Sequence, residues 1–194
     1  MNGSTWHSYR FSIDHRQPGF FSEPYYHLYY NKQFLNAGLK PIAKYFSSID
    51  TNLNYDNKNV VAIENELKES GVTFRSVDIA HYEAELEKLF HFNAIAFREN
   101  FLYTPIDKDL FIQKYFQAKK FIRPEFTIMA EDERKNLIGY IFCMDDVYNK
   151  KEKSLIIKTI ARHPDKKWGG LGHVLGNLIY REAARENYKS VIHA

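Results

Sequence analysis

The stretch "SLIIKTIARHPDKKWGGLGHVLGNLIYREAA", from Ser154 to Ala184, decides which fold this chain can adopt. Its first part is an apolar run typical of a buried strand, and the glycines that follow predict a tight turn. After the turn, apolar side chains recur at helical spacing and mark one buried helix face: Leu171, Val174, Leu175, Leu178, Ile179 and Ala183. We therefore expect a strand, a glycine-rich bend and a helix in direct succession.

A glycine-rich bend at the start of a helix is a candidate anion site, because free backbone N–H groups and the helix dipole point at the same place. Lys166 and Lys167 add positive charge beside it.

Two common nucleotide-binding loops do not match the sequence of this bend. A P-loop needs Lys-Ser or Lys-Thr after its last glycine, and a dinucleotide loop needs G-x-G-x-x-G. The run from Gly170 to Gly176 has one residue too many, and the next predicted strand ends at His193 without an acidic residue.

The bend resembles the acyl-CoA-binding motif of the GNAT superfamily of N-acyltransferases, in which a strand runs into R/Q-x-x-G-x-G/A and a helix begins. Here the motif spans Lys167 to Gly172, with Lys167 in place of the usual Arg or Gln. The element order from about Val72 onward, a strand, two helices and three strands, also resembles that family. The resemblance implies an α/β fold whose mixed, mostly antiparallel sheet is flanked by helices, either incomplete or permuted.

The resemblance also implies which groups hold acetyl-CoA as a co-substrate. The preceding strand would pair with the pantetheine arm, as an added strand does, through Ile160, Ala161 and Arg162. Direct attack of a neutral amine on the thioester would follow, and it requires a proton acceptor and stabilisation of the oxyanion. No metal is implied. The pyrophosphate would lie on the backbone amides of Lys167, Trp168, Gly169, Gly170, Leu171 and Gly172, with His173 close behind.

The sequence leaves the general base unassigned. In the family it often lies on the strand before the CoA-binding one, here "NLIGYIFCMDD", where only the terminal Asp145 and Asp146 could serve. Glu99, Glu131 and Asp132 are further candidates. All five are equally compatible with solvated surface acids, so the residues that catalyse the reaction stay unknown at this stage.

The first fifty residues resemble the late part of the same fold. The family's leaving-group acid is commonly a tyrosine in "Y-x-x-x-G-F", and the similar "FLNAGLK" has Phe34 at that position, which cannot donate a proton. Tyr29 and Tyr30 nearby are more typical of aromatic packing. "STWHSYRFSI" before this pattern and "PIAKYFSSID" after it are predicted strands.

Three units are therefore predicted: residues 1–50 as a late piece of the fold, residues 51–71 as a linking helix, and residues 72–194 as the early and central piece with the acyl-CoA motif. Three arrangements stay open. The first piece could complete the second within one chain, as in a circular permutation, or complete a second chain by exchange in a homodimer. The chain could also be a fragment of a longer tandem protein.

Composition narrows the function. The formal charge of +3 is too slight for a nucleic-acid-binding surface, and no run predicts a membrane span or signal peptide. The single cysteine, Cys143, is predicted to be a buried, inert thiol, which favours a reducing, cytoplasmic location. We expect an acyl-CoA-dependent N-acyltransferase that acetylates the amine of a small molecule or protein. The alternative is a non-catalytic module of this fold that binds acyl-CoA or a partner.

Overall fold

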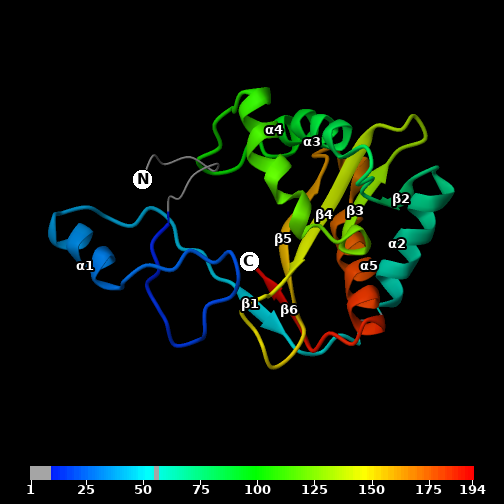
Figure 1. The fold of residues 1–194 in the computed structure, drawn as a ribbon. Coiled ribbons are helices and arrows are strands. Elements are labelled where there is room, and N and C mark those ends of the chain that lie inside the picture. Colours follow the sequence, from blue (N-terminus) through cyan, green and yellow to red (C-terminus); the bar gives the residue numbers. More distant parts are fainter. Residues whose placement is uncertain (1–9, 55–56) are drawn as a thin grey trace.

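The computed structural model describes residues 10–54 and 57–194. Figure 1 shows the strands β1 (Ser48–Asp50), β2 (Thr73–Ser76), β3 (Thr127–Glu131), β4 (Leu137–Asp145), β5 (Ser154–Arg162) and β6 (Ser190–His193). The α-helices are α1 (Tyr29–Asn36), α2 (Lys58–Glu69), α3 (Tyr82–Ala96), α4 (Lys108–Phe116) and α5 (Leu171–Arg185). Short 3-10 turns lie at Gln117–Phe121, Pro124–Phe126 and Lys166–Trp168.

The described strands form one sheet of six in the order β1-β6-β5-β4-β3-β2. Four of the five neighbouring pairs are antiparallel, and only β5 and β6 run parallel, because α5 carries the chain back between them. The predicted mixed, mostly antiparallel α/β sheet is confirmed. The succession of strand, bend and helix from Ser154 to Arg185 is confirmed with it.

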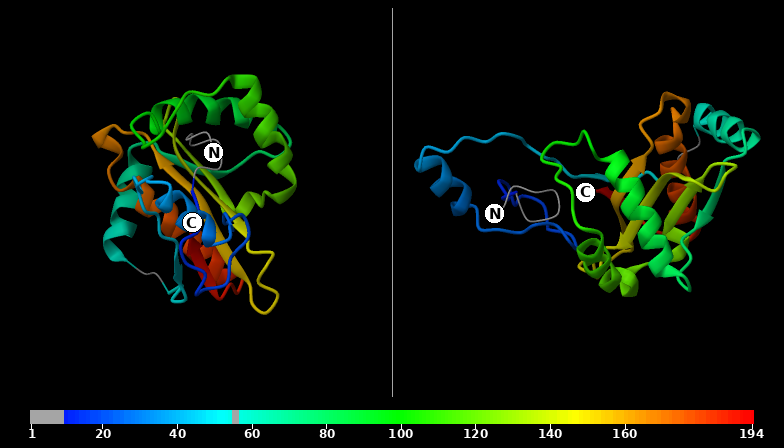
Figure 2. Two further views of the ribbon diagram at one scale, coloured as in Figure 1. Left: turned by 90° about the vertical axis from the view of Figure 1, so that its left-hand side faces the viewer. Right: turned by 90° about the horizontal axis from the view of Figure 1, so that it is seen from above.

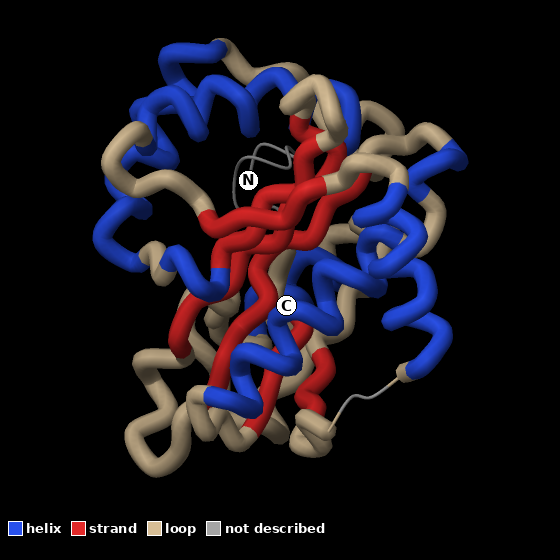
Figure 3. Tube along the Cα trace, turned by 90° about the vertical axis from the view of Figure 1, so that its right-hand side faces the viewer, coloured by secondary structure: helices blue, strands red, loops and turns tan. Residues whose placement is uncertain are grey.

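Helices cover both faces of the sheet (Figure 3). On one face α2 and α5 enclose the larger core, in which Leu171, Val174, Leu175 and Ile179 are fully buried. On the other face α3 and α4 pack on Met129, Tyr140 and Ala161. Gly139 in β4 lets α5 approach closely, since a Cβ there would lie 2.8 Å from Leu171 Cδ2 and 3.0 Å from the Ala161 carbonyl oxygen.

The N-terminal segment, residues 10–50, reaches away from this body and returns to it through β1 (Figures 1 and 2). Phe20 is its anchor and packs with Met144, Ile156 and Ile192. The N–H of Phe21 donates to Asp146 Oδ1 at 2.9 Å. The helix α1 has no buried residue. In this structure a strand from the first fifty residues completes the edge of its own chain's sheet, since Ser48 pairs with His193.

Of the two strands predicted in this segment, one is shorter than predicted and the other falls mostly outside the described residues. Most of the predicted strand "STWHSYRFSI" lies outside the described residues, and residues 10–13 form no strand. "PIAKYFSSID" contributes only Ser48–Asp50 as β1, because residues 41–47 are all exposed and no strand in the described part of the chain pairs with them. A sequence pattern indicates which residues can adopt an extended conformation. Whether they form a strand depends on a neighbouring strand to pair with, and that neighbour is determined by the fold.

Candidate functional site

The bend between β5 and α5 is built around Gly170, the N-cap of α5. Its φ of +81° is left-handed, a conformation that glycine adopts without a Cβ penalty. A Cβ there would also approach Ile63 Cγ2 of α2 at 2.9 Å. The buried ring of Trp168 fixes the approach to the bend from the core side. The backbone of the bend is therefore held from both sides.

The amide groups of the bend fall into two sets. The N–H groups of Gly170, Leu171 and Gly172 have no hydrogen-bond acceptor among the described residues. They stand in sequence at the N-terminus of a 15-residue helix, where the dipole favours an anion. Four others donate within the protein: Lys167 to Asp165 Oδ1 at 3.0 Å, Trp168 to Asp165 O at 3.1 Å, Gly169 to Lys166 O at 2.9 Å and His173 to Gly170 O at 2.9 Å.

The second half of β5 has a free edge beside this bend. Pairing with β6 stops at Ile157, opposite His193, although pairing with β4 continues to Arg162. On the β6 side, residues 158–162 have no strand partner within the part of the chain that is described. Ile160 links the edge to the bend, because a Cβ at Gly172 would lie 3.9 Å from its Cδ1. The edge and the three amides therefore adjoin.

A β-bulge lies where the two parallel strands part. The register between β4 and β5 shifts between Phe142, which faces Thr159, and Cys143, which faces Ile157. Lys158 is left as the extra residue of β5. Because a bulge increases local twist and bends its strand, it can turn β5 away from β6 at this level.

Three polar side chains meet at the end of β6, and no pattern in the sequence indicates that they lie together. Tyr180 of α5 donates its hydroxyl to Asp50 Oδ2 of β1 at 3.1 Å, and His193 Nε2 lies 2.8 Å from the same hydroxyl oxygen. If Tyr180 donates to Asp50, Nε2 of the exposed His193 is the donor to the Tyr180 hydroxyl oxygen, and Nδ1 is the ring nitrogen left to accept a proton. The group depends on the pairing of β1 with β6, which no local pattern reveals.

The tyrosines on the α3 and α4 face hold their protons tightly. Tyr140 donates to Asn93 Oδ1 at 3.1 Å, and burial raises the pKa of its hydroxyl well above the ordinary value. Tyr82 donates to the Tyr115 carbonyl oxygen at 3.1 Å, and burial raises its pKa to about 12. Near neutral pH both hydroxyls therefore stay protonated and donate these structural hydrogen bonds.

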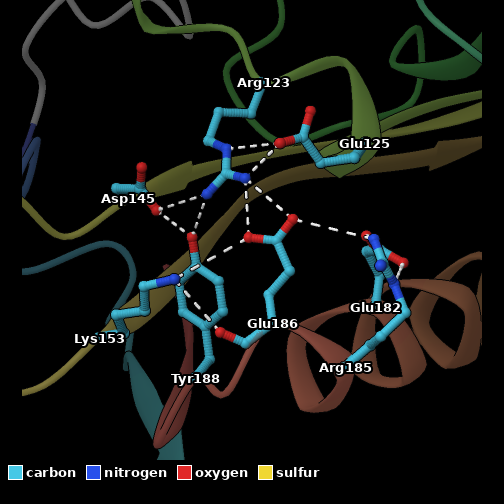
Figure 4. A network of polar contacts seen from close by, with 8 residues as sticks. All are labelled: Arg123, Glu125, Asp145, Lys153, Glu182, Arg185, Glu186 and Tyr188. Carbon is cyan, nitrogen blue, oxygen red and sulfur yellow. Dashed lines mark hydrogen bonds and ion pairs between the residues drawn. The ribbon is translucent and has the colours of Figure 1, made fainter.

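Asp145 and Asp146 take part in contacts at the far end of the sheet. Figure 4 shows Asp145 accepting from Tyr188 in a network around Arg123, which also contacts Glu186 at 2.8 Å. Asp145 pairs with Leu155 at the start of β5, seven residues from Arg162. Asp146 accepts the N–H groups of Phe21 and Tyr148.

The other three carboxylates are also accounted for. Glu131 is buried and accepts from Arg75 at 2.6 Å and Lys88 at 3.1 Å, and these contacts lower its pKa. Asp132 closes the β3–β4 turn by accepting from Asn136. Glu99 is exposed in the turn after α3. None of the three lies on the bend or on the free edge of β5.

The remaining predictions concern the cysteine, the N-terminal aromatic residues, metal ligands and membrane spans. Cys143 is buried as predicted, and burial raises the pKa of its thiol. Tyr30 contacts the rings of Phe11, Tyr26 and Tyr29, whereas Phe34 is 40% exposed in α1. Among the described residues, no group of three or more potential ligands could hold a metal ion, and no helix is long and apolar enough to cross a membrane.

Comparisons with known proteins show the fold. No protein-family profile and no curated protein matches the chain. The structure is similar to a "GCN5-related glucosamine N-acetyltransferase region" of a fungal multi-domain GH3 β-N-acetylglucosaminidase, with a TM-score of 0.57 and 10% identity over 93% of this chain and 21% of that one. It is also similar to L-PGS from Bacillus licheniformis, with a TM-score of 0.52 and 14% identity over 76% of this chain and 45% of that one.

A GCN5-related N-acetyltransferase from Sphaerobacter thermophilus is similar at 13% identity over 63% of this chain and 35% of that one, with a TM-score of 0.47. The chain therefore spans less than half the length of each of these three proteins. The match to the fungal region covers all but about 14 of the 194 residues of this chain. It therefore includes most of residues 1–50. The chain has the fold of GCN5-related N-acetyltransferases, the GNAT fold.

Proposed function

We propose that this chain, which has the GNAT fold, binds an acyl-CoA at the bend and at the free edge of β5. The observation that carries the proposal is that the three amides at Gly170–Gly172 adjoin the second half of β5, and that neither has a backbone partner there among the described residues. A pyrophosphate suits the amides because it is an anion at a helix N-terminus. An extended pantetheine arm suits the edge because its amide groups can pair with a strand.

The residues of the proposed site have distinct roles. Gly170, Leu171 and Gly172 donate to the pyrophosphate, and the exposed Lys166 and Lys167 contribute charge at its rim. Ile160, Ala161 and Arg162 supply the backbone of the free edge. Trp168 and Gly169 shape the bend, and His173, exposed one turn into α5, lies next to the amides. The co-substrate is acetyl-CoA in this proposal.

The reaction we propose is acetyl transfer to the amine of a small molecule or protein. The neutral amine attacks the thioester carbonyl, the C–S bond breaks, and the amine loses a proton. His193 is the proton acceptor we favour, because it lies where β5 and β6 part and its Nδ1 is available once Tyr180 has fixed Nε2. The buried thiol, Cys143, takes no part, and its state fits a reducing cytoplasm.

Acetyl-CoA titration by calorimetry tests binding. Gly172→Glu places a carboxylate among the three amides, so we expect its affinity to fall by at least about tenfold, the loss of one charge-assisted contact. Gly176→Ala is the matched control, because nothing lies within 4 Å of a Cβ there. Equal binding by wild type and Gly172→Glu, with both folded by circular dichroism, is incompatible with the proposal.

The alternative is a module of the same fold that binds acyl-CoA without turning it over. It is favoured by Phe34, which stands where the family's acid is a tyrosine and cannot donate a proton. Release of CoA thiol from acetyl-CoA in the presence of a panel of amines separates the two. Turnover that falls in His193→Gln, with acetyl-CoA affinity unchanged, supports the enzyme. Binding with no turnover of any amine supports the module.

A further inference from the structure

Lys158 occupies a position unlike that of the other described lysines. It is the extra residue of the bulge in β5, at the level where β6 stops pairing. Its side chain is partly buried beneath the N-terminal segment, with Nζ 3.5 Å from the Ser22 carbonyl oxygen, at the outer limit of a hydrogen bond. No carboxylate lies within 4 Å of this amine among the residues that the structure describes.

The surroundings of Lys158 favour the neutral amine. Burial lowers its pKa, and the positive charge of Arg10 in the N-terminal segment lowers it further. Glu23 of the same segment opposes the effect and is the smallest of the three influences. A lysine amine that is desolvated beside another cation is a stronger nucleophile near neutral pH than an exposed one, because a larger fraction is unprotonated.

Lys158 is also within reach of a thioester held on the free edge. Ile160 marks the level of the bend, since its Cδ1 would lie 3.9 Å from a Cβ at Gly172. Lys158 is two residues further along β5, about 7 Å in an extended strand. The pantetheine arm has about twelve bonds between phosphate and sulfur, roughly the length of four extended residues or ~14 Å. An arm that follows the edge from the bend therefore passes Lys158.

We propose that Lys158 is a self-acylation site, at which the chain transfers the acyl group of a bound acyl-CoA to its own Nζ. The inference rests on the proposed acyl-CoA site. The neutral amine attacks the thioester carbonyl carbon, the N–C bond forms, and the C–S bond breaks. The nitrogen loses its proton as the CoA thiolate leaves, so the products are an acyl-lysine amide and free CoA thiol.

The product is a modification rather than an intermediate, because an amide does not return its acyl group to an amine at a useful rate. Acylation converts the amine of Lys158 into an uncharged amide and places an acyl group where the thioester would lie. Acylated chains should therefore bind acetyl-CoA more weakly than unmodified ones. Self-acylation also needs no external amine, so the site can be tested before any acceptor is known.

The test is incubation of the 194-residue chain with acetyl-CoA at pH 8, followed by peptide mass spectrometry. We expect Lys158 to gain an acetyl group at least about ten times faster than the exposed Lys151, because a bound donor raises its effective concentration. The rate at Lys158 should also level off at a lower pH than is usual for a lysine amine. Lys158→Arg should abolish the fast acetylation, and Lys151→Arg should leave it unchanged.

Two binding results would contradict self-acylation of Lys158. They differ in whether they also contradict the proposed acyl-CoA site. If calorimetry shows that acetyl-CoA binds while Lys158 is acetylated no faster than Lys151, self-acylation is wrong and the acyl-CoA site stands. If acetyl-CoA does not bind at all, both proposals fail together. Fast acetylation of Lys158 that persists in Gly172→Glu would show ordinary chemical acylation of a reactive lysine, which also contradicts the proposal.

Discussion

At the scale of single residues, Gly170 sets the direction of the whole bend. Its left-handed φ of +81° turns the chain from the 3-10 turn at Lys166–Trp168 into α5, and three successive amides are left without an acceptor in the part of the chain that is described. Gly172, two residues later, is an ordinary helical residue with room for a Cβ. The two glycines of the motif therefore have different physical roles, backbone conformation at the first and open space at the second.

This difference predicts opposite effects of alanine. Gly170→Ala should lower the free energy of unfolding by about 1–2 kcal/mol, the cost of a left-handed non-glycine residue, besides its approach to Ile63. Gly172→Ala should leave it unchanged or raise it by about 0.5–1 kcal/mol, because alanine is the better helix former. Urea unfolding at pH 7 measures both. Equal losses in the two variants would contradict the assigned conformations.

At the scale of elements, β5 connects every part of the proposed site. Its first half pairs on both sides and anchors the strand in the core, and its second half keeps one free edge that leads to the bend. At the opposite ends of the sheet, ion networks hold the elements in place. One of them joins Arg75, Glu131 and Lys88 and fastens β2 and α3 to β3.

The network around Glu131 makes stability depend on pH. Because Arg75 and Lys88 lower the pKa of Glu131 in the folded state, the stabilisation is present above the unfolded value of about 4.3. It is lost as pH falls through the folded pKa. We expect Glu131→Gln to cost about 1–3 kcal/mol at pH 7, and to flatten the fall in unfolding free energy between about pH 5 and pH 3. Urea unfolding across that range tests this, and an unchanged slope would argue against it.

At the scale of the whole molecule, local patterns in the sequence predict the central strand, bend and helix. Apolar periodicity located α5, the apolar run in "SLIIKTIA" located β5, and the glycines located the bend, because each depends on neighbours within a turn or strand. The side chains near the divergence of β5 and β6 could not be found that way. His193, Tyr180 and Asp50 meet only because β1 pairs with β6, across more than 140 residues of chain.

The bulge at Lys158 could also not be predicted from the sequence. Nothing in "IIKTI" distinguishes an extra residue from a paired one, since a bulge is a property of the register with β4. The same limit applies to residues 41–47, which have strand-like residues but pair with no strand among the described residues. The proposed acyl-CoA site therefore combines a motif that the sequence shows with an edge that only the assembled sheet creates.

The most direct test of that site is an amide NMR titration of the 15N-labelled chain with acetyl-CoA. The account predicts that the largest shifts fall on the amides of Gly170, Leu171 and Gly172 and on residues 158–162 of β5, with little change in α1 or around Arg123. Saturable shifts confined to other parts of the chain, or no shifts at millimolar acetyl-CoA, would contradict it.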